Sequence, residues 1–297
     1  MLSVLIPTYD YNCFPFVHEL HNQLLKEKIS FEIICFDDGS NSISNLENQK
    51  INSLWNSKFE ALKNNIGRSS IRNLLVKEAK KDWVLFLDAD GFPVKDDFIK
   101  TYIKNIKESS DYFSGFIGGR IHKLDQDKNL RIKFGTQREE LSVNSRNKTP
   151  YRFFFTSNVA LKRIVFENIY FNEKLKNYGY EDLLFGNEMR GLGLKVLHIN
   201  NPVYHLNIDD NTVFINKTKQ GLKNLLFIKQ QNFIEEKDIK LLIYFDKINR
   251  LGLQKIMKKN LLFFMNKAIK SSSLFYYNLF KLSYLCYLKD QELHEAK

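Results

Sequence analysis

The segment WVLFLDADGF, residues 83–92, runs from a wholly apolar stretch directly into two carboxylates. A short apolar run such as Trp83–Leu87 is typical of a strand that is buried on both faces. Asp88 and Asp90 follow it, one residue apart. Carboxylates at a strand end are hard oxygen ligands that suit Mg²⁺ or Mn²⁺, but acids in this position also occur in solvated turns. The motif alone predicts a strand end and leaves its chemistry open.

Short apolar runs alternate with helical patterns through the first 110 residues. Strands are expected at 3–7, 31–36 and 83–87, with a further short strand at 59–64, and helices at 14–28, 68–81 and 96–107. Strands that alternate with helices form a parallel sheet with right-handed crossovers, so the predicted fold class is α/β.

Polar residues occur at the same end of three of these strands. In an open parallel sheet, ligands bind outside the carboxyl ends of the strands, so these side chains predict a nucleotide or metal site. They are Thr8 and Asp10 after the first strand, Asp37 and Asp38 after the second, and Asp88 and Asp90 after the fourth.

The composition describes a folded globular protein of one or two domains, with 297 residues, 43% of them hydrophobic and 14% aromatic. Cys13, Cys35 and Cys286 are far apart in sequence and lack CxxC spacing, which fits a reducing compartment. The first ten residues lack the basic segment of a signal peptide, and no apolar run approaches the roughly 18 residues of a membrane span. The expected location is the cytoplasm.

The net charge of +11 lies mostly in residues 211–297, which hold 16 Lys and Arg against 7 Asp and Glu. Residues 1–210 hold 29 and 27. Leu, Ile, Phe and Tyr recur at helical spacing among these lysines, which predicts a basic amphipathic helical extension on an anionic membrane surface, at the inner face of the membrane. The alternatives are a helical bundle on the catalytic domain or a dimer interface. The basic region carries no recognised nucleic-acid-binding motif, so a nucleic acid is not expected as a partner.

Several segments, in order and spacing, resemble family 2 glycosyltransferases of the GT-A fold, over roughly residues 1–210. The resemblance implies a nucleotide-binding half at 1–110 and an acceptor half at 111–210. It also implies transfer of a sugar from a UDP-sugar, with Mn²⁺ or Mg²⁺, to a carbohydrate or lipid-linked acceptor in surface polysaccharide or glycolipid synthesis. The segments are VLIPTYDYN (4–12), ICFDDGS (34–40), NIGRSSIRN (65–73), VLFLDAD (84–90), SNVALKR (157–163), FNEKLKNYGYEDLLFGNEMRGLGLKV (171–196) and NPVYHL (201–206).

The resemblance assigns donor-binding roles in the first half. Asp38 would accept a hydrogen bond from uracil N3–H, which cytosine cannot donate; an Asx-turn is the alternative. Arg68 and Arg72 lie one helical turn apart and could bind phosphate or base, or lie on a solvated face. Asp88 would contact the sugar or the ribose. The residues implied to bind the donor nucleotide are Pro7, Thr8, Tyr9, Asp38, Arg68, Arg72 and Asp88.

The resemblance implies that Asp90, the last acid of the Asp-x-Asp motif, binds the metal ion. The metal ion would bridge the two phosphates of the donor. His205 could supply a neutral imidazole ligand, as in several relatives, or it could be a structural histidine.

The segment YGYEDLLFG, 178–186, is the second acidic centre. The resemblance makes Asp182 the general base that deprotonates the acceptor, with inversion at the anomeric carbon, and Glu181 a residue that orients the acceptor. Tyr178 and Tyr180 could stack on a sugar ring. The structural alternative is a helix start, where acids favour the helix dipole.

Two other functions compete with this interpretation. VLFLDADGF also resembles the first motif of haloacid-dehalogenase-type phosphatases, with Asp88 as nucleophile and Asp90 as acid–base partner. Phe92 stands where that family prefers Thr or Val, and the motif comes late in the chain. The second alternative is a degenerate glycosyltransferase, which binds nucleotide but acts as an assembly partner and not as an enzyme. Retention of Asp38, Asp90 and Asp182 argues against it.

Overall fold

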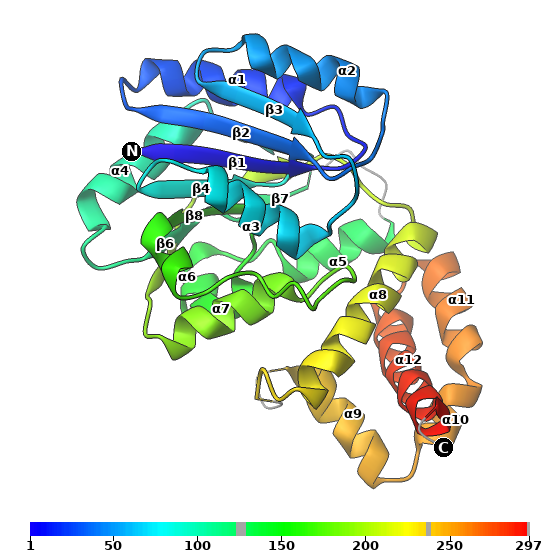
Figure 1. Ribbon diagram of the computed structural model, residues 1–297. Coiled ribbons are helices and arrows are strands. Elements are labelled where there is room, and N and C mark those ends of the chain that lie inside the picture. Colours follow the sequence, from blue (N-terminus) through cyan, green and yellow to red (C-terminus); the bar gives the residue numbers. More distant parts are fainter. Residues whose placement is uncertain (123–128, 236–238, 296–297) are drawn as a thin grey trace. The chain divides into compact units, whose positions relative to one another are not determined.

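The structure is a computed structural model that describes residues 1–122, 129–235 and 239–295 (Figure 1). The chain divides into two compact units, and both are discontinuous in sequence. The first unit comprises Met1–Leu124, Arg138–Lys176 and Glu181–Asn207, and the second comprises Asp125–Gln137, Asn177–Tyr180 and Ile208–Lys297.

The first unit is built on a seven-stranded sheet in the order β3-β2-β1-β4-β8-β6-β9. Strands β1 to β4 pair in parallel, whereas β8 runs antiparallel to both of its neighbours, β4 and β6. The strand bounds are β1 (Leu2–Thr8), β2 (Phe31–Asp37), β3 (Ser57–Ala61), β4 (Trp83–Leu87), β6 (Gly115–Ile117), β8 (Asn158–Lys162) and β9 (Val196–His198).

Helices cover both faces of this sheet, and alternation along the strands supplies a core on each face. Val4 and Ile6 belong to one apolar cluster, together with side chains of α1 and α4. Leu5 belongs to the other, together with side chains of α3 and α7. The helices of this unit are α1 (Phe14–Lys26), α2 (Ser44–Asn48), α3 (Arg68–Glu78), α4 (Phe98–Ser109), α6 (Val143–Asn147) and α7 (Glu181–Gly191), with 3₁₀ helices η1 (Gln49–Ser53), η2 (Pro150–Phe153) and η3 (Arg163–Glu167).

A small second sheet joins distant parts of the first unit in the order β5-β10-β7. Its strands are β5 (Gly91–Pro93), β7 (Arg120–Ile121) and β10 (Val203–His205). Because His205 pairs with Gly91 in the antiparallel register, the end of β10 lies beside the residue that follows Asp90. The sheet therefore joins the late histidine segment to the acidic motif.

A buried arginine fixes the chain on the way into β7. Arg146 donates to Gly118 O (3.3 Å), to Ile199 O (3.1 Å) and to His198 Nδ1 (2.8 Å). Since His198 Nδ1 accepts, its Nε2–H is free to donate to Pro150 O at 2.9 Å. Burial lowers the pKa of His198 to about 4, so the ring is neutral at pH 7.

The second unit is helical. Asp210 caps α8 by accepting the backbone N–H groups of Thr212 and Val213. Phe214 of α8 stacks on Tyr277 of α12, with ring centroids 5.3 Å apart. The helices of this unit are α5 (Leu130–Arg138), α8 (Asn211–Gln230), α9 (Lys240–Arg250), α10 (Gln254–Lys259), α11 (Leu261–Ser271) and α12 (Leu274–Glu295).

The second unit also holds two segments that the sequence analysis placed in the acceptor half. The N-terminus of α5 is tied to α8, because Asn211 Oδ1 accepts the Leu130 N–H at 2.8 Å. Asn224 of α8 donates to the carbonyls of Asn177 and Gly179, both at 2.8 Å. The helical unit therefore extends beyond the predicted range 211–297.

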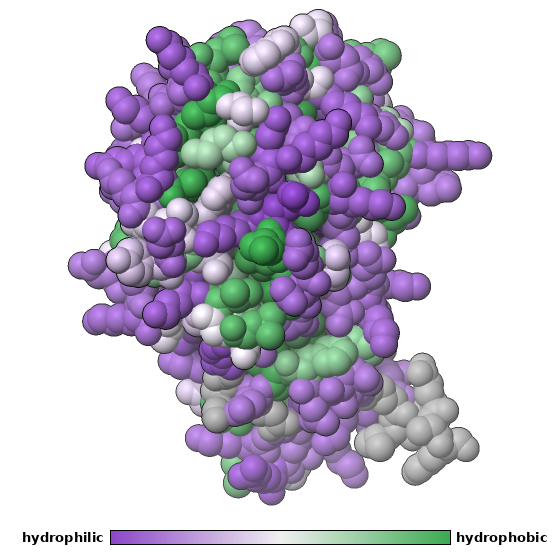
Figure 2. Space-filling model, turned by 60° about the vertical axis from the view of Figure 1, so that its left-hand side comes forward, coloured by the Kyte–Doolittle hydropathy of each residue, from purple (hydrophilic) through white to green (hydrophobic). Residues whose placement is uncertain are grey.

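The surface is mixed in character. On the face drawn in Figure 2, hydrophilic side chains cover most of the area, and apolar side chains come to the surface in patches. Within residues 1–122, 129–235 and 239–295, no helix has both the length and the apolar character needed to cross a membrane.

Candidate active site

The parallel strands bring the predicted polar residues to one edge of the sheet. Thr8 pairs with Asp37 across β1 and β2, and Asp88 follows β4, which pairs with β1 on its other side. The carboxyl ends of β1, β2 and β4 therefore meet, as the sequence predicted. Thr8 is buried, Pro7 is half-buried, and Tyr9 is exposed directly after the strand.

Asp38 spans from this edge to the loop before α3. Its Oδ1 accepts the Ile66 N–H at 2.7 Å, and its Oδ2 accepts the Gly67 N–H at 3.0 Å. Burial raises the pKa of Asp38, although these two N–H donors lower it. The local side-chain contact in this turn is made by its neighbour, because Asp37 accepts both the N–H and the hydroxyl of Ser40.

Gly39 allows the two loops to approach closely. Its φ is +67°, and a Cβ at this position would lie 2.4 Å from the carbonyl carbon of Asn64. A side chain here would clash with backbone, so the contact between the β2 end and the loop before α3 requires glycine.

Arg68 and Arg72 share one face of α3, as predicted, and both contact carboxylates. Arg72 is 2% exposed and donates to Asp88 Oδ1 at 3.0 Å, while its second nitrogen lies 3.8 Å from Glu181 Oε1. Arg68 Nε donates to the same Glu181 oxygen at 2.7 Å. The solvated-face alternative is wrong for Arg72, because its guanidinium is buried between two acids.

These arginines control the charge of their acidic partners. Burial raises the pKa of Asp88, but the charges of Arg72 and Arg68 outweigh it and hold the pKa below its usual value. The same balance lowers the pKa of Glu181. Both carboxyls are therefore ionised at neutral pH.

Asp182, the next residue after Glu181, behaves in the opposite way. Burial and the neighbouring Glu181 charge raise its pKa to about 6, against the lowering effects of Arg72 and a hydrogen bond from Thr156. Thr156 Oγ1 donates to Asp182 Oδ1 at 2.7 Å, and the Thr156 N–H donates to Oδ2 at 3.2 Å. A fixed carboxylate with a pKa near neutrality suits a general base.

Asp90 and His205 meet through the small sheet. His205 Nε2 and Asp90 Oδ2 lie 3.1 Å apart, and the Leu206 N–H donates to the Asp90 carbonyl at 2.9 Å. The His122 ring stands edge-on to His205, with centroids 5.5 Å apart, and its Nδ1 contacts Glu140 Oε1 at 2.5 Å.

The metal that the resemblance implies fits this pair. A carboxylate oxygen and an imidazole nitrogen are donor types that bind Mn²⁺, these two lie 3.1 Å apart, and Asp88 lies two residues before Asp90. Among the described residues, no group of three or more His, Cys, Asp or Glu side chains is arranged to hold a metal. Such ions are commonly bound by only two protein ligands. Phosphate oxygens or water then fill the remaining coordination positions.

Sequence reasoning missed Thr156 and a further cation, Arg120. The charge of Arg120 is one of those that lower the pKa of Asp88. Its guanidinium contacts Glu139 Oε1 at 2.7 Å and lies 5.0 Å from the Phe155 ring centroid. Near Arg120, the sequence signal was the glycine pair at 118 and 119 that precedes it. Glycine is needed at position 118 because a Cβ there would lie 2.3 Å from the Asn201 carbonyl oxygen.

The two tyrosines expected to stack on sugar belong to the second unit. Lys217 Nζ lies 5.4 Å from the Tyr178 ring centroid. Tyr180 has a φ of +71° and packs against Gly221, and burial raises its pKa to about 12. The structure therefore groups these rings with α8, and their role toward a sugar stays a prediction.

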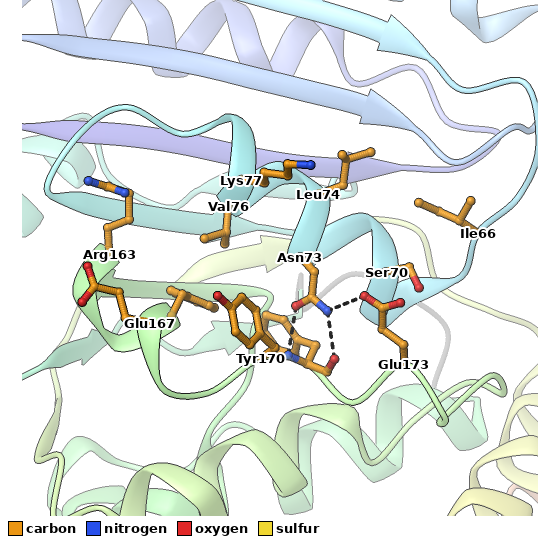
Figure 3. A pocket seen from close by; sticks show the side chains of 12 residues that line it. Ile66, Ser70, Asn73, Leu74, Val76, Lys77, Arg163, Glu167, Tyr170 and Glu173 are labelled. Carbon is orange, nitrogen blue, oxygen red and sulfur yellow. Dashed lines mark hydrogen bonds between the residues drawn. The ribbon is translucent and has the colours of Figure 1, made fainter.

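A groove of about 990 Å³ lies on the outer side of α3, between that helix and the segment 163–173 (Figure 3). Its lining includes none of the acids described above. Asn73 crosses it, donating to the Phe171 carbonyl at 2.9 Å and to Glu173 at 2.8 Å, and accepting the Phe171 N–H. We interpret this groove as a packing seam, because the amide at its centre is already paired.

The chain belongs to glycosyl transferase family 2, whose sequence profile matches residues 3–176. The poly(ribitol-phosphate) β-N-acetylglucosaminyltransferase TarS of Staphylococcus aureus (strain Mu50) is 34% identical over 94 residues, and the same figures hold for strain MW2. That match covers 30% of this chain and only 16% of the relative. The family match decides against the phosphatase alternative.

Solved structures agree with this assignment at the level of the fold. S. aureus TarS 1–349 in complex with UDP superposes with a TM-score of 0.50 at 21% identity, over 76% of this chain and 65% of that one. A mannosyltransferase of Pyrobaculum calidifontis in complex with GDP-Man and Mn²⁺ superposes with a TM-score of 0.51 at 13% identity. The match covers 76% of this chain and 64% of that one. The predicted GT-A fold is confirmed.

Proposed function

We propose that this protein is an inverting glycosyltransferase that moves a sugar from a UDP-sugar to a hydroxyl group of a carbohydrate or lipid-linked acceptor, in the synthesis of a surface polysaccharide or glycolipid. The observation that carries the proposal is Asp182, a carboxyl with a pKa of about 6 that Thr156 fixes, in the same unit as the acids at the strand ends. The family membership and the UDP complex of TarS support a nucleotide-sugar as donor.

The donor end of the site would be formed by the carboxyl ends of β1, β2 and β4. Asp38 uses one lone pair of each carboxylate oxygen for Ile66 and Gly67, so a further lone pair remains for the uracil N3–H. The exposed ring of Tyr9 and the adjoining backbone of Pro7 and Thr8 would form the wall beneath the base.

Asp90 and His205 would hold the metal, which when bound neutralises the negative charge that develops on the departing diphosphate. Arg72 supports this end of the site indirectly. It keeps Asp88 ionised and fixes its carboxylate next to the metal ligands, where that side chain can accept hydrogen bonds from the sugar or ribose.

Asp182 would take the proton from the acceptor hydroxyl as that oxygen attacks the anomeric carbon. At pH 7 a carboxyl with a pKa near 6 is mostly ionised, yet it is more basic than an ordinary aspartate. Glu181 is less suited to this role because Arg68 and Arg72 engage it and lower its pKa. Attack opposite the leaving group would convert a UDP-α-sugar into a β-linked product.

The C-terminal helices support the cellular part of the proposal. Their excess of lysine suits an anionic membrane surface, where a lipid-linked acceptor would be found. This location would be the inner face of the membrane.

The decisive experiment compares the wild type with Asp182→Asn, which keeps the shape of the side chain and removes its basicity. Hydrolysis of a panel of UDP-sugars and transfer to simple sugar acceptors should fall by about 10²–10⁴-fold, whereas the affinity for UDP should be retained. Asp111→Asn, an exposed aspartate, serves as the control. Near-normal turnover in Asp182→Asn, or a product that keeps the α-configuration by NMR, would contradict the assignment. A wild type that binds UDP but transfers no sugar would favour the degenerate assembly partner.

A further inference from the structure

Helices α10 and α11 leave most of their apolar side chains outside the core of the second unit. No residue of α10 is buried, and α11 buries only Ala268, although it begins with the apolar run Leu261–Met265. Helix α8 of the same unit buries eight residues. The exposed large apolar side chains of this region are Leu251, Leu253, Ile256, Leu262, Phe263 and Phe275.

The exposed fraction of the side chains is large in the apolar run at the start of α11. Leu262 is 65% exposed and Phe263 is 49% exposed, in the first turn of α11. In Figure 1, α11 lies alongside α12. The Phe263 ring stands edge-on to Tyr276 of α12, with centroids 6.1 Å apart, so this contact covers only part of the ring. Folding of the described residues thus leaves most of Leu262 and about half of Phe263 in contact with solvent.

The same region is unusually one-sided in charge. Between Asp246 and Asp290 there are nine Lys and Arg residues and no Asp or Glu. Lys258 pairs with Asp290, beyond the end of this stretch. Lys255 and Lys259 of α10 and Lys267 and Lys270 of α11 are exposed.

Lysines and apolar side chains share one face of α11. Phe263 and Lys267 are four residues apart, and Lys267 Nζ lies 6.0 Å from the Phe263 ring centroid. Leu262 and Lys270 are eight residues apart, again on one side of the helix. Lysine stems can lie along apolar surface while their charged ends stay among polar groups, so lysines beside apolar side chains are compatible with a helix at a lipid–water interface.

We propose that this surface docks on an anionic lipid bilayer. The docking surface is defined as the exposed side chains of residues 251–270: Leu251, Leu253, Lys255, Ile256, Lys259, Leu262, Phe263, Lys267 and Lys270. Leu262 and Phe263 enter the boundary between headgroups and acyl chains, and the lysines contact the anionic headgroups. The inference refines the membrane location in the proposed function and does not depend on the sugar-transfer chemistry.

Charge argues for a bilayer over a second copy of this chain. Two copies that met through this surface would bring several lysines against each other with no acid among them, and like charges across an interface are unfavourable. An anionic bilayer satisfies both features at once, because it offers negative headgroups and an apolar interior. Neither feature alone anchors a protein stably, and the surface carries both.

The test is sedimentation of the full chain with vesicles of phosphatidylcholine and phosphatidylglycerol at 7:3, compared with phosphatidylcholine alone. Binding is expected to the anionic vesicles at about 50 mM salt and to weaken at about 500 mM, where charges are screened over a few ångströms. Leu262→Ser/Phe263→Ser should lose at least about tenfold in binding. Lys255→Ser/Lys259→Ser should lose about 25-fold, because each lysine near an anionic surface contributes roughly a factor of five.

The matched control is Ile43→Ser/Leu46→Ser, which changes two apolar side chains of the first unit that are 83% and 71% exposed. It should bind vesicles like the wild type. The proposal is overturned if the wild type does not bind anionic vesicles at low salt, or if the Leu262/Phe263 variant binds as well as the control. It is also overturned if light scattering without vesicles shows a dimer that this variant converts to a monomer. UDP-sugar hydrolysis in solution should be unchanged in all three double variants, so a failure of docking is separable from a failure of the proposed chemistry.

Discussion

Thr156 Oγ1 donates a 2.7 Å hydrogen bond to Asp182 Oδ1, and the Thr156 N–H reaches the second oxygen of the same carboxylate. Both oxygens of the proposed base are thereby fixed by one residue, which lies two positions before the start of β8. Because β8 pairs with β4, the strand that leads into Asp88, the position of Asp182 is tied to the strand that precedes the proposed metal ligand Asp90.

Thr156→Val should move the pH dependence of activity. The hydroxyl lowers the pKa of Asp182, so its loss raises that pKa above the present value of about 6. Activity needs the ionised form, so the acidic limb of the kcat profile should shift to higher pH. At pH 7 kcat should fall by about 2- to 15-fold, since a hydrogen bond to a charged group contributes roughly 1.5–3 kcal/mol, which raises the pKa by about one to two units. Thr156→Ser keeps the hydroxyl and should stay close to the wild type; equal profiles for all three proteins would contradict the role of Thr156.

Arg72→Met should destabilise the fold strongly. The substitution leaves the buried Glu181 and the partly exposed Asp88 without this cation, and breaking a buried ion pair from one side costs about 3–5 kcal/mol. Lys77→Met, on the exposed side of the same helix, should change the free energy of unfolding by less than about 0.5 kcal/mol. Urea unfolding of the two variants measures the difference, and equal midpoints would show that the Arg72 pairs do not stabilise the fold.

UDP should bind more tightly with Mn²⁺ than without it, and Asp90→Ala should abolish the difference. His205→Ala should reduce it, because His205 Nε2 lies 3.1 Å from Asp90 Oδ2 and is the second proposed ligand. Calorimetric titration of UDP with and without Mn²⁺ gives the ratio of affinities for each variant, with Asp111→Asn as the control. A wild type without any metal effect would remove the proposed metal site.

His198 should make the protein sensitive to acid. Its pKa is about 4 in the fold and about 6.5 when unfolded, so the unfolded chain binds the proton more readily. The resulting stability is fully present above pH 6.5 and is lost as the pH falls toward 4, a difference of roughly 3 kcal/mol. His198→Gln should lose less stability between pH 7 and 4.5 than the wild type, whereas His18→Gln, at an exposed position, should follow the wild type. Urea unfolding at both pH values measures the free energy of unfolding. An equal loss of this free energy between pH 7 and 4.5 in the wild type and in His198→Gln would refute the prediction.

Sequence patterns predicted the first half of the sheet because its signals are local. The strand expected at 83–87 has those bounds in the structure, and the helix expected from residue 68 begins there. The short strand expected at 59–64 lies instead at Ser57–Ala61. Of its five residues only Phe59 is buried, so this edge strand carries a weak apolar signal.

The contacts that shape the site could not be predicted in the same way. Arg68 meets Glu181 across 113 positions of sequence, and Thr156 meets Asp182 across 26. Such pairs leave no periodicity, because they depend on how separate elements pack. Asp38 shows the same limit: its motif predicted a ligand-binding acid, but its backbone partners in the loop before α3 emerge only from the fold.

The interleaving of the two units restricts how this protein can be divided or recombined. The chain passes between them at five points, and the last short passage, Asn177–Tyr180, is held by Asn224 and ends immediately before Glu181. A fragment that stopped at residue 207 would remove the donor that binds the Asn177 and Gly179 carbonyls, in the segment that leads into α7. The helical unit is therefore not a cassette that a single crossover could exchange between glycosyltransferases, and we expect the two units to be inherited, expressed and engineered as one piece.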